Sequence, residues 1–202
     1  MICASCKAPL PEGAAFCPSC GNRVGLKPYA EMDEWPETSV LLSIFQEADE
    51  YERKDDYQTE LQILSKGLRI APDNCSLMLR LGRAFWRLGY DQKAIDYYRR
   101  AERLNPRDPI VYVNIAAVYI SRGMYAEARP YLERGIAIIE ADPLSASAGD
   151  IAVTYGNYAL CAGELGDRSG AKKYLALAKK NGYRRESLET VCSRLHLDPD
   201  GI

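Results

Sequence analysis

The chain repeats itself with a period of 34 residues. Residues 75–108 (CSLMLRLGRAFWRLGYDQKAIDYYRRAERLNPRD) align without a gap with residues 109–142 (PIVYVNIAAVYISRGMYAEARPYLERGIAIIEAD). Both segments place a glycine at the expected turn, Gly89 in the first and Gly123 in the second. Self-similarity at a fixed period of this length indicates a supersecondary unit that buries its apolar face only by stacking on its neighbours. The repeat therefore limits this part of the chain to a stacked, repetitive architecture.

The same frame extends in both directions. Residues 41–74 form an earlier copy, and residues 152–185 form a later copy after a nine-residue insert at 143–151. The first copy departs most from the others, because Glu60 stands where the second helix of the other copies has a small residue. The last copy lacks the closing proline. The sequence therefore predicts four units.

Each unit is predicted to be a pair of helices joined by a tight turn. In the second copy, Leu81, Phe85 and Leu88 follow the i, i+4, i+7 spacing of one apolar helix face. Tyr98 and Ala101 belong to the apolar face of the partner helix, and small residues on both helices permit a close approach. The fold class that we expect is mainly α.

These residues resemble the tetratricopeptide repeat, whose usual length is about 34 residues. The resemblance covers residues 41–185 and implies an α-solenoid of about four helix pairs within residues 39–202. Residues 186–197 carry apolar side chains at helical spacing and are expected to form a helix that caps the open end of the stack.

The resemblance also implies a concave groove lined by the first helix of each pair. Arg80, Arg83 and Arg87 follow i, i+3, i+7 spacing with Trp86 beside them, which is the composition of a binding hot spot for a carboxylate or phosphate partner. The groove prediction includes Leu79 on the same helix. The alternative is a basic face that pairs with the acidic first copy, which has seven acidic residues between positions 45 and 60. Both interpretations stay open at this point.

Two asparagines, Asn114 and Asn157, occupy the same repeat position and complete the predicted groove. Related repeats that clamp peptide C-termini use asparagines here, so the resemblance implies contact with a peptide backbone or terminal carboxylate. The lysines and arginines of such a clamp are absent from these two helices, which disfavours a carboxylate clamp.

The N-terminus carries two Cys-x-x-Cys pairs separated by ten residues. Four thiolates from Cys3, Cys6, Cys17 and Cys20 match the tetrahedral ligand set of a structural zinc site, with iron as the alternative metal. The pattern resembles a short bacterial zinc-ribbon, and we expect it to hold one structural Zn²⁺ over residues 1–24. A closed site of four cysteines leaves no open position for catalysis. Residues 25–38, rich in acidic residues and proline, are predicted to be a linker.

The overall charge and the apolar runs exclude several classes of function. The net charge is −2 and the isoelectric point is about 5.6, so no basic field attracts nucleic acid. The longest apolar run, residues 110–120, is too short to cross a membrane, and the start at Met1 leaves no room for a signal peptide before the first cysteine pair. We therefore expect a cytoplasmic protein.

No catalytic motif stands out in the sequence, and the sole histidine follows the last repeat. We expect a non-enzymatic adaptor or scaffold that binds a protein or peptide in the groove, with the zinc-ribbon as a second docking module. The alternatives are a nucleic-acid-associated factor that uses the ribbon, or a regulatory subunit of an enzyme complex.

Overall fold

The computed structural model describes residue 9 and residues 36–202. Contacts divide the chain into two compact units, Met1–Ser43 and Ile44–Ile202, and each is considered by itself. Apart from residue 9, the predicted zinc-ribbon (1–24), with all four of its cysteines, lies outside the described residues. In the first unit the described part is essentially the start of a helix at Pro36, inside the segment predicted as a linker.

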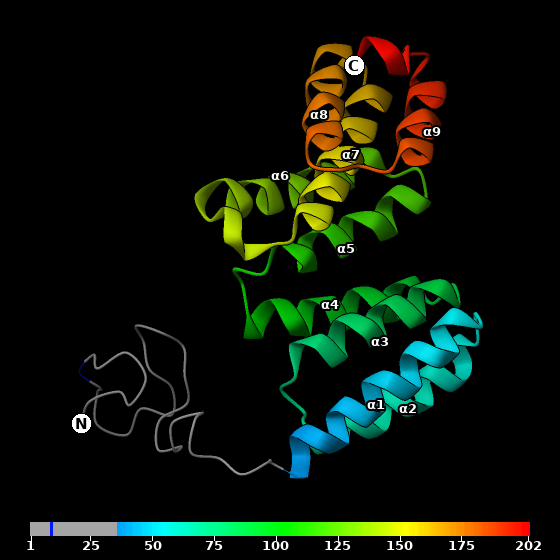
Figure 1. Cartoon of the computed structure of the whole chain (residues 1–202), viewed down its shortest axis with the longest axis vertical. Helices are drawn as coiled ribbons and strands as arrows, with labels where there is room; N and C mark the ends of the chain where they lie inside the picture. Colours follow the sequence, from blue (N-terminus) through cyan, green and yellow to red (C-terminus); the bar gives the residue numbers. More distant parts are fainter. Residues whose placement is uncertain (1–8, 10–35) are drawn as a thin grey trace. The chain divides into compact units, whose positions relative to one another are not determined.

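The described residues form nine α-helices, arranged as four successive pairs and a final helix (Figure 1). The helices are α1 (Pro36–Arg53), α2 (Tyr57–Ile70), α3 (Cys75–Arg87), α4 (Asp91–Leu104), α5 (Pro109–Ser121), α6 (Tyr125–Ala141), α7 (Ala148–Glu164), α8 (Arg168–Lys180) and α9 (Arg185–Leu195). Two short 3-10 helices, Pro143–Ser145 and Pro199–Gly201, follow α6 and α9. The prediction of a mainly α fold built from repeated helix pairs is confirmed, and no strand occurs between residues 36 and 202.

Local capping residues explain where the helices begin. The side chain of Asn74 accepts a hydrogen bond from the Leu77 amide at 3.0 Å and so caps α3. The Asp108 carboxylate caps α5 in the same way. Ser147 and Asp150 form a reciprocal capping box that restarts the repeat after the insert. Such caps satisfy amide groups that have no partner inside the helix.

The turn inside each pair needs a left-handed backbone at one fixed repeat position. Gly89, Gly123 and Gly166 adopt φ values of 82°, 73° and 90°, where a residue with a side chain would be strained. The first pair has Asp55 at this position, with φ 56°. Aspartate tolerates this conformation better than most residues, so the same turn forms without glycine.

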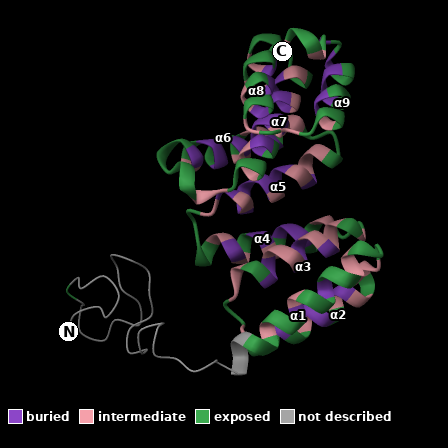
Figure 2. Ribbon diagram, viewed as in Figure 1, coloured by how far each residue is buried: buried purple, intermediate pink, exposed green. Residues whose placement is uncertain are grey.

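The helices of the second unit form two layers. Helix α5 contacts α3 and α7, so the first helices of successive pairs lie against one another. The second helices of the two middle pairs each fill the space between neighbouring first helices: α4 contacts α3 and α5, and α6 contacts α5 and α7. In Figure 2 the buried residues follow these contact surfaces while the outward faces are exposed. This is the arrangement expected of stacked helix pairs.

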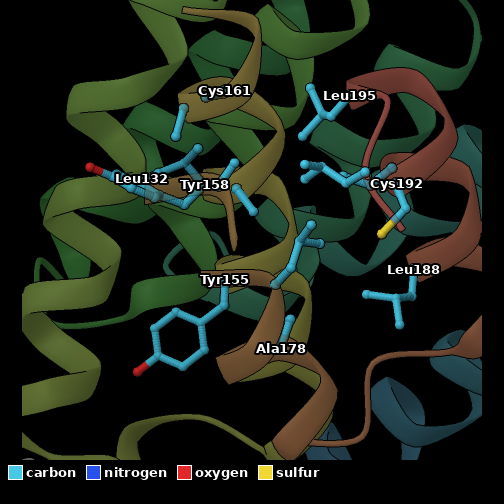
Figure 3. Packing of buried hydrophobic residues seen from close by; sticks show 14 of the residues in the cluster. Leu132, Tyr155, Tyr158, Cys161, Ala178, Leu188, Cys192 and Leu195 are labelled. Carbon is cyan, nitrogen blue, oxygen red and sulfur yellow. The ribbon is translucent and has the colours of Figure 1, made fainter. Parts of the chain in front are cut away.

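The buried core runs from each pair into the next. Met78, Tyr98 and Ile115 belong to one cluster, so α3, α4 and α5 share a core. A second cluster joins α5 to α9, and Figure 3 shows part of it, with Leu132 and Tyr158 among the labelled residues. Helix α9 buries its apolar face against α7 and α8. It covers apolar surface of the last pair, as expected of a capping helix.

Candidate partner-binding surface

The groove residues predicted on α3 are Leu79, Arg80, Arg83, Trp86 and Arg87, and the structure places all five on this one helix. Only Arg87 is exposed, and the other four are half-buried. Leu79 and Trp86 pack against the core shared by α3, α4 and α5. Much of the apolar surface of the predicted hot spot is therefore already in contact within the chain.

Arg80 and Arg83 form ion pairs with acidic residues of α1. Arg80 Nη2 donates to the carboxylates of Asp49 and Glu52, and Arg83 Nη2 donates to Glu52 Oε2 at 2.6 Å. The Arg80 side chain keeps only 17% of its surface exposed, and its guanidinium carbon lies 5.4 Å from the centre of the Phe45 ring. The alternative interpretation, in which the basic face pairs with the acidic first copy, accounts for the charges of these two arginines.

Arg87 and Trp86 make weaker contacts that leave polar groups exposed. The Arg87 guanidinium lies over the Tyr57 ring at 5.8 Å and beside the Trp86 ring at 5.7 Å. Trp86 Nε1 donates to Ser121 Oγ on α5 at 3.2 Å, which ties α3 to α5. Among the residues of known placement, no carboxylate pairs with Arg87, so its charge is free for a partner.

Glu60 is buried next to this ionic cluster. Its side chain is 1% exposed, and Oε1 has no hydrogen-bond partner within the described structure. Burial raises the pKa of Glu60 to about 7; the nearby Glu52 adds to the rise, and Arg83 opposes it. Glu60 takes the position that alanine occupies in the other three pairs (Ala94, Ala128 and Ala171). The first pair thus carries a buried carboxyl group where its neighbours carry a methyl group.

Asn114 on α5 and Asn157 on α7 are half-buried at the repeat position that Arg80 occupies on α3. Neither side-chain amide has a hydrogen-bond partner in the described part of the chain. Both amides reach solvent, because neither is a fully buried polar group without a partner. We call the exposed and half-buried surface of α3, α5 and α7 that includes Trp86, Arg87, Asn114 and Asn157 the first-helix face.

The cysteines of the repeats are poor candidates for chemistry. Cys161 and Cys192 are buried and Cys75 is half-buried, as expected of small apolar residues. Burial raises the pKa of Cys161 to about 12 and also raises the pKa of Cys75 and Cys192. A thiol that stays protonated at neutral pH is a weak nucleophile and a weak metal ligand. The described residues hold no cluster of potential metal ligands, and the four predicted zinc ligands are not among them.

Within residues 36–202, no helix has the length and apolar character needed to cross a bilayer.

Sequence analysis did not assign specific partners to the arginines, although the repeat contains a signal for them. Arg80 lies 31 residues after Asp49, and Arg83 lies 31 residues after Glu52. Contacts between equivalent helices of successive pairs join residues whose separation in the sequence is constant and close to the repeat length. An acidic residue at that offset could have been sought in the sequence. The contacts of Tyr57 and Ser121 with this surface were also missed.

Comparison with known proteins agrees with this geometry. Two family models described as tetratricopeptide repeat match residues 76–118 and 110–142. The chain therefore contains tetratricopeptide repeats, and the matches overlap α3 to α6. The two matched segments together span the region in which the 34-residue period was first evident.

Among curated proteins, the chain is similar to a protein called CTR9 homolog from Arabidopsis thaliana, with 39% identity over 56 residues. The match covers 28% of this chain and only 5% of that protein. Among solved structures, PilW, described as a widely conserved type IV pilus biogenesis factor, superimposes with a TM-score of 0.65 at 19% identity. That alignment covers 81% of this chain and 72% of PilW.

A variant of O-GlcNAc transferase from Thermobaculum terrenum superimposes with a TM-score of 0.60 at 20% identity. The alignment covers 73% of this chain but 27% of that enzyme. At this identity the likeness shows a shared helical-repeat fold.

Proposed function

We propose that this chain is a non-enzymatic adaptor that binds a segment of another protein on the first-helix face. The tetratricopeptide repeats support this function, because stacked helix pairs present an extended surface for a protein or peptide. Residues 1–24 are proposed to form a second docking module held by one Zn²⁺ ion bound to Cys3, Cys6, Cys17 and Cys20.

The row formed by Asn114 and Asn157 is the observation that carries the proposal. A side-chain amide offers both a donor and an acceptor, which matches the donor and acceptor of a peptide group. The two amides lie on helices in contact with each other and have no partner among the described residues. They can therefore hold the backbone of a segment laid across α5 and α7, largely independently of its side chains.

The α3 end of the first-helix face determines which side chains of the partner segment are preferred. Arg80 and Arg83 already pair with Asp49 and Glu52, so an acidic partner residue would have to displace these carboxylates. Arg87 and the half-buried Trp86 are free of that competition. We expect the partner segment to place an acidic or aromatic side chain near Arg87 rather than near Arg80.

The test is affinity capture from native cells with the full chain. The double variant Asn114→Ala/Asn157→Ala should lose at least one partner that the wild-type chain retains. Gln62→Ala is the matched control, because Gln62 is an exposed amide on α2, outside the first-helix face.

A partner found in this way is then tested as a purified protein. We expect the double asparagine variant to weaken its affinity about tenfold, which corresponds to the loss of one or two hydrogen bonds. An identical set of captured proteins for the wild-type chain and for the double variant would contradict the proposed surface.

A further inference from the structure

A cavity of about 190 Å³ opens where the end of α7, the start of α8 and the end of α9 meet. Two arginines line it, Arg168 from α8 and Arg194 from α9, together with Glu164 and His196. None of these four residues is among the predicted groove residues or the predicted zinc ligands.

Close packing of α9 on α7 shapes the wall of this cavity. Gly163 lies against Leu195, and a Cβ atom at Gly163 would come within 2.5 Å of the Leu195 side chain. After Leu195, the backbone of His196 turns into the left-handed region, and the Leu197 amide donates back to the Cys192 carbonyl at 2.8 Å. This helix ending places residues 196 and 197 beside the turn between α7 and α8.

Arg194 is held in a fixed orientation. Its Nε donates to Glu164 Oε1 and its Nη2 donates to the Tyr125 hydroxyl. The guanidinium carbon also lies 5.6 Å from the centre of the Tyr125 ring. A guanidinium has five N–H donors, so those that Glu164 and Tyr125 do not accept are available to a ligand. The Arg194 guanidinium that carries them is already oriented.

Arg168 brings a charge that the chain does not neutralise. The only hydrogen bond that its guanidinium makes to another described residue runs from Nη2 to the His196 carbonyl oxygen, at 3.1 Å. No carboxylate pairs with it in this part of the chain. With Glu164 offsetting Arg194, the two arginines and the one acid leave a net positive charge at the cavity. The first turn of α8 is capped separately, because Asp167 accepts from the Gly170 amide at 2.8 Å.

We propose that this cavity binds a phosphoryl dianion, as inorganic phosphate or as a phosphomonoester group, through the guanidinium groups of Arg168 and Arg194. A volume of 190 Å³ equals the space of about six water molecules, which suits one small anionic group and not a whole nucleotide. Two guanidiniums that approach from different helices match the several oxygens of a tetrahedral phosphoryl group. A planar carboxylate is satisfied by a single guanidinium fork.

The test is a titration of the isotope-labelled full chain, followed by amide NMR at constant ionic strength and neutral pH. With inorganic phosphate, the signals of Gly163, Leu195 and Leu197 should shift and saturate. Glycerol phosphate serves as a second probe: saturation by both ligands indicates a phosphomonoester group on a larger molecule, and saturation by phosphate alone indicates the free ion. Acetate should bind at least tenfold more weakly than phosphate.

Arg168→Gln should weaken phosphate binding about tenfold, the usual effect of losing a charge-assisted hydrogen bond. Arg103→Gln is the matched control, because Arg103 is exposed on α4 without an ion pair in the described structure and should leave binding unchanged. Unchanged melting temperatures for both variants establish that they fold. The proposal is overturned if phosphate causes no saturable shift, if acetate binds as tightly, or if both arginine variants have the same effect.

Discussion

Gly82 on α3 and Tyr98 on α4 fit together without room for a side chain at residue 82. A Cβ atom there would lie 2.4 Å from Cε1 of the Tyr98 ring. In the other three pairs the equivalent positions hold alanine and leucine, and every one of these residues is fully buried: Ala48 with Leu64, Ala116 with Leu132, and Ala159 with Leu175. The second pair therefore exchanges one methyl group on its first helix for a larger ring on its second helix.

We expect Gly82→Ala to destabilise the protein by about 2 kcal/mol, because the overpacking outweighs the gain in helix propensity. Adding Tyr98→Leu should recover part of this loss, since the pair then has the composition of its neighbours. Chemical denaturation measures both changes. Gly149→Ala is the control, since its nearest contact would be Ser147 Oγ at 3.7 Å. A double variant no more stable than Gly82→Ala would contradict this account.

The buried carboxyl of Glu60 should make stability depend on pH. Its pKa is about 7 in the folded chain, against 4.5 for the ordinary group, so the folded state binds the extra proton between these values. Stability from this group is therefore fully present below pH 4.5 and is lost as the pH rises through 7. The total is about 3 kcal/mol.

Glu60→Gln should match the wild-type chain near pH 4.5 and exceed it in stability at about pH 8, because the amide mimics the protonated acid. Thermal or urea unfolding of both chains across this pH range gives the difference between their unfolding free energies. The contributions of all other titrating groups are the same in both chains, so they cancel in this difference. Glu47→Gln, on an exposed acid of α1, should show no such trend. If the difference in unfolding free energy does not change with pH across this range, Glu60 ionises in the folded chain without a cost in free energy, which contradicts the prediction.

The repeat positions explain how much of this fold the sequence could predict. Gly89, Gly123 and Gly166 recur in register because the backbone geometry of the turn requires glycine, so the period was visible without a structure. The pairing of Arg80 with Asp49 was not assigned, because one helix face is compatible with either solvent or a neighbouring pair. The cavity at Arg168 and Arg194 was also missed, because it depends on the path that the chain takes after α9, outside the repeat.

Asp55 offers a stabilising change. It has φ 56° at the position where the next pair has Gly89, and its side chain accepts a hydrogen bond from the Tyr57 hydroxyl. We expect Asp55→Gly to stabilise the chain by about 0.5–1 kcal/mol, because relief of the left-handed strain exceeds the loss of an exposed hydrogen bond. Denaturant midpoints measure the change. Gly89→Asp, the reverse exchange in the second pair, should destabilise the chain; equal stability of both variants with wild type would contradict the strain.

The zinc proposal predicts that metal removal acts only on the N-terminal module. The purified chain should contain one zinc ion, measured by elemental analysis, and a strong chelator should remove it. Because a small four-cysteine module without its metal has little core of its own, residues 1–24 should unfold on chelation. The circular dichroism of the helices between residues 36 and 202 should stay unchanged, since their core contains no metal ligand cluster.

Matched cysteine variants separate the proposed ligands from the other thiols. Cys17→Ser/Cys20→Ser should abolish zinc binding, because one Cys-x-x-Cys pair leaves the ion with half of its ligands. Cys75→Ser should retain one zinc per chain, because Cys75 is a half-buried thiol at the start of α3. Zinc retained by the double variant, or a large fall in helical signal on chelation of the wild-type chain, would contradict an autonomous zinc-held module.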